Sequence, residues 1–202
     1  MSASGPTATS AIAATMDFSL LQIADPFQAH GGRSNKSAVV SSNGGPANWL
    51  LPSATVAFEP STFGGESDAN RLTVSFRVAD DPLAQVQQLD EWFLNYCLQH
   101  SMRLFGQDLT FDQIEERYNS PLKYNDRYGF SLRAKYVASG AQATRFWTPE
   151  RTRRGPPEMW KGTSLIAQLQ IRTVWFVGRN FGLTLTINDA QVEESIQPAY
   201  PF

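Results

Sequence analysis

Positive charge in this chain is concentrated between Arg117 and Arg179. That stretch holds twelve Lys and Arg residues against three acids, a net charge of +9, whereas the rest of the chain holds five bases and sixteen acids. Tyr, Phe and Trp residues are interspersed among the cations. Cations neutralise phosphates and flat rings stack on bases, so this combination is typical of proteins that bind single-stranded nucleic acid.

The candidate contacts are of two kinds. Lys and Arg on polar strand faces or in loops are expected to neutralise phosphates, and Trp residues beside a basic loop are expected to stack on bases. The alternatives are a solvated strand face, a chance cluster or localisation signal in a loop, and a place in the core for the rings. The predicted nucleic-acid-binding residues are Lys123, Arg127, Arg133, Lys135, Arg145, Trp147, Arg151, Arg153, Arg154, Trp160, Lys161 and Arg179.

Trp175 is ranked behind Trp147 and Trp160 for stacking. It precedes Phe176 in an apolar strand, and adjacent strand residues point to opposite faces. One of this pair is therefore expected in the core. Arg179 is expected at the tip of a tight turn that Gly178 makes accessible.

The sequence has no catalytic signature. It lacks G-x-S-x-G, G-x-x-x-x-G-K-[ST] and H-E-x-x-H. Cys97 is its one cysteine, and His30 and His100 lie far apart, which disfavours zinc. We expect no enzyme activity, no catalytic residue, no metal and no cofactor.

Helices are expected in the middle of the chain, after an alternating strand at residues 71–79. Asp81 is the predicted N-cap of the first helix, with Pro82 at its first position, and this helix should end near Gly106. Thr110 and Gln113 form a capping box for a second helix that runs to about Tyr118.

The remaining elements are expected to be strands. Apolar residues alternate with polar ones after Pro121, for instance Leu132 and Ala134 against Arg133 and Lys135. A charged loop is expected at residues 150–157, and a tight turn at 178–180. The predicted strands span residues 37–41, 54–59, 130–136, 143–148, 164–177 and 183–192.

These elements predict a mainly β (α+β) fold, an OB-fold-like antiparallel Greek-key barrel with a helical insertion at about residues 82–118. A β-sandwich is the nearest competitor. We expect a disordered arm at residues 1–15, one OB-like nucleic-acid-binding domain at 16–193 and a flexible tail at 194–202. No apolar run is long enough to span a membrane. The start of the chain lacks the charge of a signal peptide, so an intracellular location is expected.

Three blocks in the second half resemble a known family. They are Asp126–Lys135 (DRYGFSLRAK), Lys161–Ser164 (KGTS) and Val174–Thr184 (VWFVGRNFGLT). Over about residues 117–193 they resemble the single-stranded DNA-binding proteins of large nucleocytoplasmic DNA viruses, which are distantly similar to the T7-type phage single-stranded DNA-binding protein.

The resemblance implies an OB-fold and sequence-tolerant binding and protection of single-stranded DNA in replication or recombination. It also implies a location in the nucleus or in a viral replication compartment. The choice between DNA and RNA, and homo-oligomer formation, stay open. The alternative function is a structural or assembly subunit, for instance of a viral particle, that associates through its divided charge.

The C-terminus also resembles a family feature. Pro201 and Phe202 follow two acids, Glu193 and Glu194, and look like the partner-recruiting tails of bacterial single-stranded DNA-binding proteins. Pro201 and Phe202 are therefore predicted to bind replication proteins. Packing of the tail on the barrel is the alternative.

Overall fold

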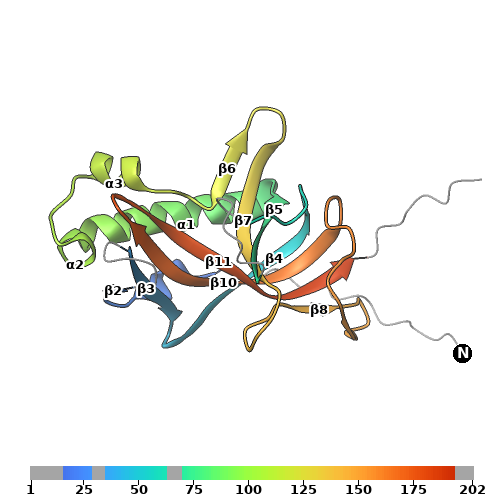
Figure 1. Cartoon of the computed structure of the whole chain (residues 1–202). Helices are drawn as coiled ribbons and strands as arrows, with labels where there is room; N and C mark the ends of the chain where they lie inside the picture. The colour runs from blue at the N-terminus through green and yellow to red at the C-terminus, as the bar shows by residue number, and fades with distance from the viewer. Residues whose placement is uncertain (1–15, 29–34, 63–69, 194–202) are drawn as a thin grey trace, which may run out of the picture.

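The computed structural model describes residues 16–28, 35–62 and 70–193. Within these residues, eleven strands belong to one curled sheet, and three α-helices lie beside it (Figure 1). A short 3₁₀ turn, Phe18–Leu20, precedes the first strand. None of the described helices is long and apolar enough to cross a membrane.

Five strands make a nearly closed circuit. They are hydrogen-bonded neighbours in the order β4 (Gly45–Thr55), β10 (Ser164–Val177), β11 (Asn180–Glu193), β7 (Gly129–Val137) and β5 (Arg71–Arg77). The chain beyond β4 returns to β5 through the bridge between Val56 and Phe76, which closes the circuit. β7 and β11 run parallel, and the other pairs in the circuit are antiparallel.

In chain order the five strands are β4, β5, β7, β10 and β11. The neighbours around the circuit are β4 and β5, β5 and β7, β7 and β11, β11 and β10, and β10 and β4, which is the order 1-2-3-5-4-1. A small, partly open barrel of five strands is the OB-fold architecture. The predicted fold class is therefore confirmed.

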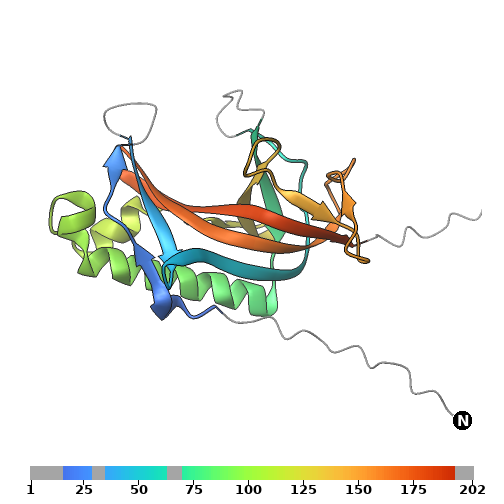
Figure 2. The same cartoon turned by 90° about the horizontal axis from the view of Figure 1, so that it is seen from below.

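The other strands extend this barrel. β3 (Asn35–Ser42) pairs with β10 beyond the end of β4, and β1 (Leu21–Ile23) and β2 (Phe27–Gln28) pair with β3. β6 (Leu122–Asn125) pairs with β7 in a hairpin that projects from the body in Figure 1. β8 (Arg145–Trp147) lies parallel to β11, and β9 (Arg153–Arg154) pairs with β8, at the opposite end of β11 from the β10–β11 turn (Figures 1 and 2).

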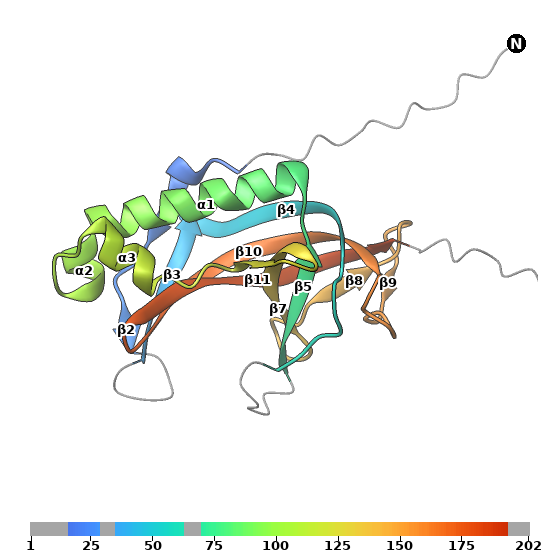
Figure 3. The ribbon, with the colours of Figure 1, turned by 90° about the horizontal axis from the view of Figure 1, so that it is seen from above.

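The helices lie between β5 and β6, as the sequence predicts. α1 (Asp80–Gln99) runs along the barrel in Figure 3, followed by α2 (Ser101–Phe105) and α3 (Phe111–Arg117). The buried residues of α1 recur at helical spacing and face the sheet. They are Val86, Leu89, Phe93 and Cys97.

The ends of the helices confirm one prediction and correct another. Both hydrogen bonds of the capping box between Thr110 and Gln113 are present. The predicted N-cap at Asp81 is wrong, because α1 begins at Asp80, two residues before the predicted first position, and Ala79 occupies the capping position without a side-chain hydrogen bond. The predicted stop at Gly106 is where α2 ends, in a left-handed conformation (φ 73°) that glycine adopts without strain.

One strand prediction is wrong. β4 covers residues 45–55, whereas residues 54–59 were expected to be the strand and the segment before them a loop. The side chains of Ala47, Trp49 and Leu51 alternate toward the core along β4. Because Pro46 and Pro52 interrupt this alternation, the segment resembles a loop in the sequence. Pro52 is tolerated because it lies where the register between β4 and β10 shifts, a place where a missing N–H breaks no regular ladder.

Aromatic rings fill both ends of the core. Near the helices, Phe93, Phe105 and Phe176 surround Phe181, with ring centroids 5.0–6.3 Å from it. At the β8–β9 end, Tyr136, Phe146 and Trp160 contact one another with centroids 5.0–5.7 Å apart. The second cluster anchors the loop between β9 and β10 to the barrel.

Replacing Trp160 with Ala should lower the free energy of unfolding by about 3–5 kcal/mol, since it leaves a cavity among buried rings. Trp147→Ala is the matched control and should cost less, because Trp147 at the end of β8 is only half-buried. Chemical denaturation followed by circular dichroism measures both. A Trp160→Ala protein as stable as the wild type would contradict this core.

Candidate nucleic-acid interface

A pocket of about 510 Å³ opens along one edge of β11. On this edge, the segment before β6 meets β11 at the bridge between Tyr118 and Phe181, and β7 meets it at Lys135 and Thr186. Among the described residues, no strand pairs with the edge between these two points. The pocket therefore fills a gap in the barrel where backbone of β11 faces outward.

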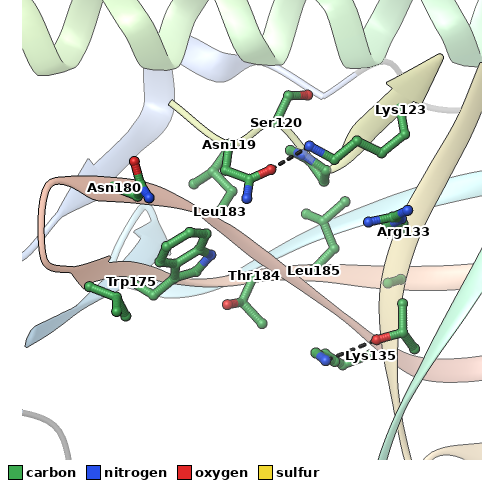
Figure 4. A pocket seen from close by; sticks show the side chains of 14 residues that line it. Asn119, Ser120, Lys123, Arg133, Lys135, Trp175, Asn180, Leu183, Thr184 and Leu185 are labelled. Atoms are coloured by element: carbon green, nitrogen blue, oxygen red, sulfur yellow. Dashed lines mark hydrogen bonds between the residues drawn. The ribbon is translucent and has the colours of Figure 1, made fainter. Parts of the chain in front are cut away.

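Three predicted cations meet at this pocket. Figure 4 shows Lys123 from β6 and Arg133 and Lys135 from β7 across the pocket from Trp175 and Asn180. Arg133 is exposed, while Lys123 and Lys135 are half-buried. Register explains the grouping, since Lys123 pairs with Ser131 and residues 131, 133 and 135 share one face of β7.

Hydrogen bonds hold the two lysines at the walls. The Lys123 ammonium donates to the Asn119 side chain, and Lys135 Nζ donates to Thr73 Oγ1 at 2.9 Å. Burial and the neighbouring Arg133 charge lower the pKa of Lys123, and the Asp90 carboxylate opposes that shift. The charges of Lys123 and Arg133 are therefore close enough to interact.

Trp175 lies on the opposite wall, and Gly182 makes room for it. Its strand partner on β11 is Gly182. A Cβ at that glycine would lie 2.5 Å from the Asn119 carbonyl oxygen and 2.8 Å from Trp175 Cζ2. The indole can therefore lie across the strand only because residue 182 has no side chain.

Asp90 on α1 fixes the segment between α3 and β6, which forms one wall of the pocket. Its carboxylate accepts hydrogen bonds from Tyr118 Oη and Ser120 Oγ, both at 2.5 Å, and Ser120 Oγ accepts one from the Leu122 N–H at 2.9 Å. Burial raises the pKa of Asp90, while the two hydroxyl donors and Lys123 act against that shift. Asp90 thereby positions the backbone that carries Asn119 and Lys123.

The lining sets what this pocket can bind. No Asp or Glu is among its lining residues, so an anion meets cations and hydroxyls, and a flat ring meets Trp175 and Leu183. Nowhere in the described parts of the chain do three His, Cys, Asp or Glu side chains gather as metal ligands would. The site suits a ligand with both phosphate and aromatic base.

A second group of predicted residues lies apart from the pocket, at β8–β9. Trp147 is half-buried, and the guanidinium of exposed Arg153 lies 5.3 Å from its ring centroid. Arg145 forms an ion pair with Asp189. Nearby Arg151 is exposed, and Arg154 is half-buried with Nε donating to the Gly155 carbonyl.

The structure corrects the prediction for Trp160. Its side chain is only 6% exposed and packs against Tyr136 and Phe146, so it has no free face for a base. The backbone N–H groups of Trp160 and Lys161 both donate to the Glu59 carboxylate, which fixes this loop and leaves Lys161 exposed.

Other predicted residues lie elsewhere. Arg127 is exposed at the tip of the β6–β7 hairpin, 5.3 Å from the Tyr128 ring centroid. Arg179 is exposed in the β10–β11 turn, next to Asn180 at the pocket. Pro201 and Phe202 fall outside the described residues, as do residues 1–15 of the expected arm and residues 194–202 of the expected tail.

Trp175, which the sequence placed behind Trp147 and Trp160 for stacking, lines the pocket. Phe176 is the buried member of the pair, which leaves the half-buried Trp175 to face the pocket. The usable signal was the combination of Trp175 with Gly182, a glycine inside an otherwise apolar strand, since such a glycine often marks a close approach. Nothing in the sequence pointed to Asp90 or Asn119.

Comparison with known proteins adds a likeness of fold. No protein-family model and no curated protein sequence matches the chain. Among solved structures, the single-stranded DNA-binding protein from bacteriophage Enc34 in complex with single-stranded DNA matches with a TM-score of 0.50 and 11% identity, over 89% of this chain and 99% of that one. The single-stranded DNA-binding protein of bacteriophage T7 matches with a TM-score of 0.48 and 13% identity, over 77% and 91% of the two chains.

Replacing Gly182 with Ala should destabilise the protein by about 1–3 kcal/mol, because the new methyl group overlaps the Asn119 backbone and the Trp175 ring. Gly155→Ala is the matched control, since a Cβ there meets nothing within 4 Å. Thermal unfolding and tryptophan fluorescence measure both variants. Equal stability and equal emission of the two would argue against the close approach at Gly182.

Proposed function

We propose that this protein binds single-stranded DNA with little sequence preference, at the pocket on the open edge of β11. The observation that carries the proposal is the meeting of Lys123, Arg133 and Lys135 with Trp175 around a pocket lined by no acid. Cations neutralise the backbone, and the indole stacks on any base, since every base has a π-face.

The place of the pocket in the fold supports this proposal. OB-folds bind oligonucleotides on the face of their second and third strands and at the loop between the fourth and fifth. Here those strands are β5 and β7, which contribute Thr73, Arg133 and Lys135, and the β10–β11 turn is flanked by Val177 and Asn180. The similar fold of the phage Enc34 protein, which is described as a complex with single-stranded DNA, adds to this support.

Binding without chemistry also fits the lining. The pocket is lined by no Asp, Glu, His or Cys, and we infer that the protein covers and protects single strands exposed during replication or recombination. An origin in a large nucleocytoplasmic DNA virus, a nuclear or viral replication location and recruitment of replication proteins by Pro201 and Phe202 remain predictions.

Fluorescence titration with oligo-dT tests the proposal. Three pocket cations should give a slope of log affinity against log salt of about −2, so affinity should fall about thirtyfold for a fivefold rise in salt. Lys123→Ala and Arg133→Ala should each reduce the slope by about 0.7, whereas Trp175→Ala should weaken binding with the slope unchanged. Lys36→Ala, a change of an exposed cation on β3, is the control.

Duplex DNA of the same length and oligo-U complete this test. Duplex should bind more weakly because its bases are stacked on one another, and oligo-U reports the choice between DNA and RNA. Equal affinity for duplex and single strand at every salt concentration would overturn the proposal. A chain that binds neither but self-associates in sedimentation would favour an assembly subunit.

Asp90→Asn separates positioning from simple electrostatics. Removing a negative charge near the pocket should on its own strengthen binding of a polyanion. Loss of a hydrogen-bond acceptor for Tyr118 or Ser120 should instead displace Lys123 and weaken that binding. We expect weaker binding and a smaller salt slope for Asp90→Asn, and no loss of affinity for Glu91→Gln, the exposed neighbour on α1. The double variant Asp90→Asn with Lys123→Ala should have the slope of Lys123→Ala alone. Tighter binding by Asp90→Asn would refute the positioning role.

A further inference from the structure

The β8–β9 end has the parts of a second stacking site. Trp147 Nε1 donates to Asp189 Oδ1 at 2.8 Å, and Arg145 pairs with the other oxygen of the same carboxylate at 2.5 Å. The indole is thus fixed in orientation before any ligand arrives. Arg145, predicted as a phosphate contact, is instead occupied with Asp189.

Arg153 completes this platform. It pairs across β8–β9 with Trp147 and places its guanidinium over the indole, 5.3 Å from the ring centroid. Bases stack on Trp rings and equally on the planes of Arg guanidinium groups. Exposed Arg151 and Lys161 add positive charge for phosphates nearby.

The platform and the pocket share one face of the barrel, as the strand register shows. Gly182, Thr184 and Thr186 share the face of β11 opposite to the core residues Leu183, Leu185 and Ile187, and Thr186 is covered (1% exposed) where β7 pairs with β11. Thr186 pairs with Gln170 and Asp189 pairs with Gln168. Because residues 168 and 170 share a face of β10, Asp189 remains on the outer face despite the bulge before it.

Distance along β11 follows from the same register. Trp175 lies opposite Gly182, and Trp147 lies opposite Gln191. Nine residues at about 3.3 Å each separate these positions by about 30 Å. Arg172 lies between these positions on β10, where it is half-buried and donates a hydrogen bond to the Gln142 side chain.

We infer that Trp147 and Arg153 form a second stacking site for the same DNA strand, about 30 Å from the pocket along β11. This inference rests on the proposed function of the pocket. The ligand is a nucleotide further along the bound strand, held by base stacking and by phosphate contact with Arg151, Arg153 or Lys161. At a stacked spacing of about 3.4 Å, roughly nine nucleotides reach from one site to the other, within the range of about 4–16 known for OB-folds.

A comparison of short and long oligonucleotides tests the second site. The affinities of dT4, which is too short to occupy both sites, and dT12 are measured by fluorescence titration for wild type, Trp147→Ala, Arg153→Ala and Trp175→Ala. Trp147→Ala should weaken dT12 binding about five- to 150-fold, the range for loss of one stacked base, and leave dT4 binding unchanged. Trp175→Ala should weaken both.

Arg153→Ala guards against a folding defect in the Trp147 variant, because this side chain is exposed. It should reduce the salt slope for dT12 by about 0.7 and leave the slope for dT4 unchanged. Phe58→Ala, an exposed ring elsewhere, is the matched control and should change neither affinity.

The outcomes separate the two proposals. Wild-type binding of both oligonucleotides, with Trp147→Ala and Arg153→Ala indistinguishable from wild type on dT12, would overturn the second site and leave the pocket intact. Failure of the wild type to bind either oligonucleotide would overturn the proposed function and the second site together.

Discussion

The open edge of β11 between Phe181 and Thr186 is the constraint on which the rest of this arrangement depends. An unpaired strand edge invites association with other chains, and proteins blunt such edges with charge, above all with Lys. Here Lys123 and Lys135 lie beside the edge, Lys123 on β6 and Lys135 on β7. In the proposed function the same cations also contact phosphate, so one set of side chains would both blunt the edge and bind the strand.

Keeping that gap open requires support from outside the barrel. The helical insertion supplies it, because Asp90 accepts hydrogen bonds from Tyr118 and Ser120 in the segment between α3 and β6, which also pairs with β11 at Phe181. A carboxylate so placed is costly, as its raised pKa indicates. Two hydroxyl donors and the Lys123 charge offset part of that cost, which couples the helix to the wall of the pocket.

The sequence predicted the parts of this site that depend on local periodicity. Alternation along β7 placed Arg133 and Lys135 on a polar face, and the capping box placed α3. The sequence could not decide which of Trp147, Trp160 and Trp175 is buried. Burial of a ring depends on the residues that pack against it, and these are distant in the sequence. Trp160 is buried by Tyr136 and Phe146 from other strands, and Trp175 is accommodated by Gly182 across the hairpin. Asp90 escaped prediction for the same reason, since its partners lie 28 and 30 residues away.

The pocket and the platform of Trp147 and Arg153 are the two ends of the proposed binding path along β11. The charged groups around the two ends differ. The pocket is lined by three cations and no carboxylate. At β8–β9, Asp189 pairs with Arg145 and accepts a hydrogen bond from Trp147, while Arg151, Arg153 and Lys161 add exposed cations. Both ends of the proposed path can therefore contact phosphate. They differ in how the indole is held, because a carboxylate fixes Trp147, whereas Trp175 lies against Gly182 across the hairpin.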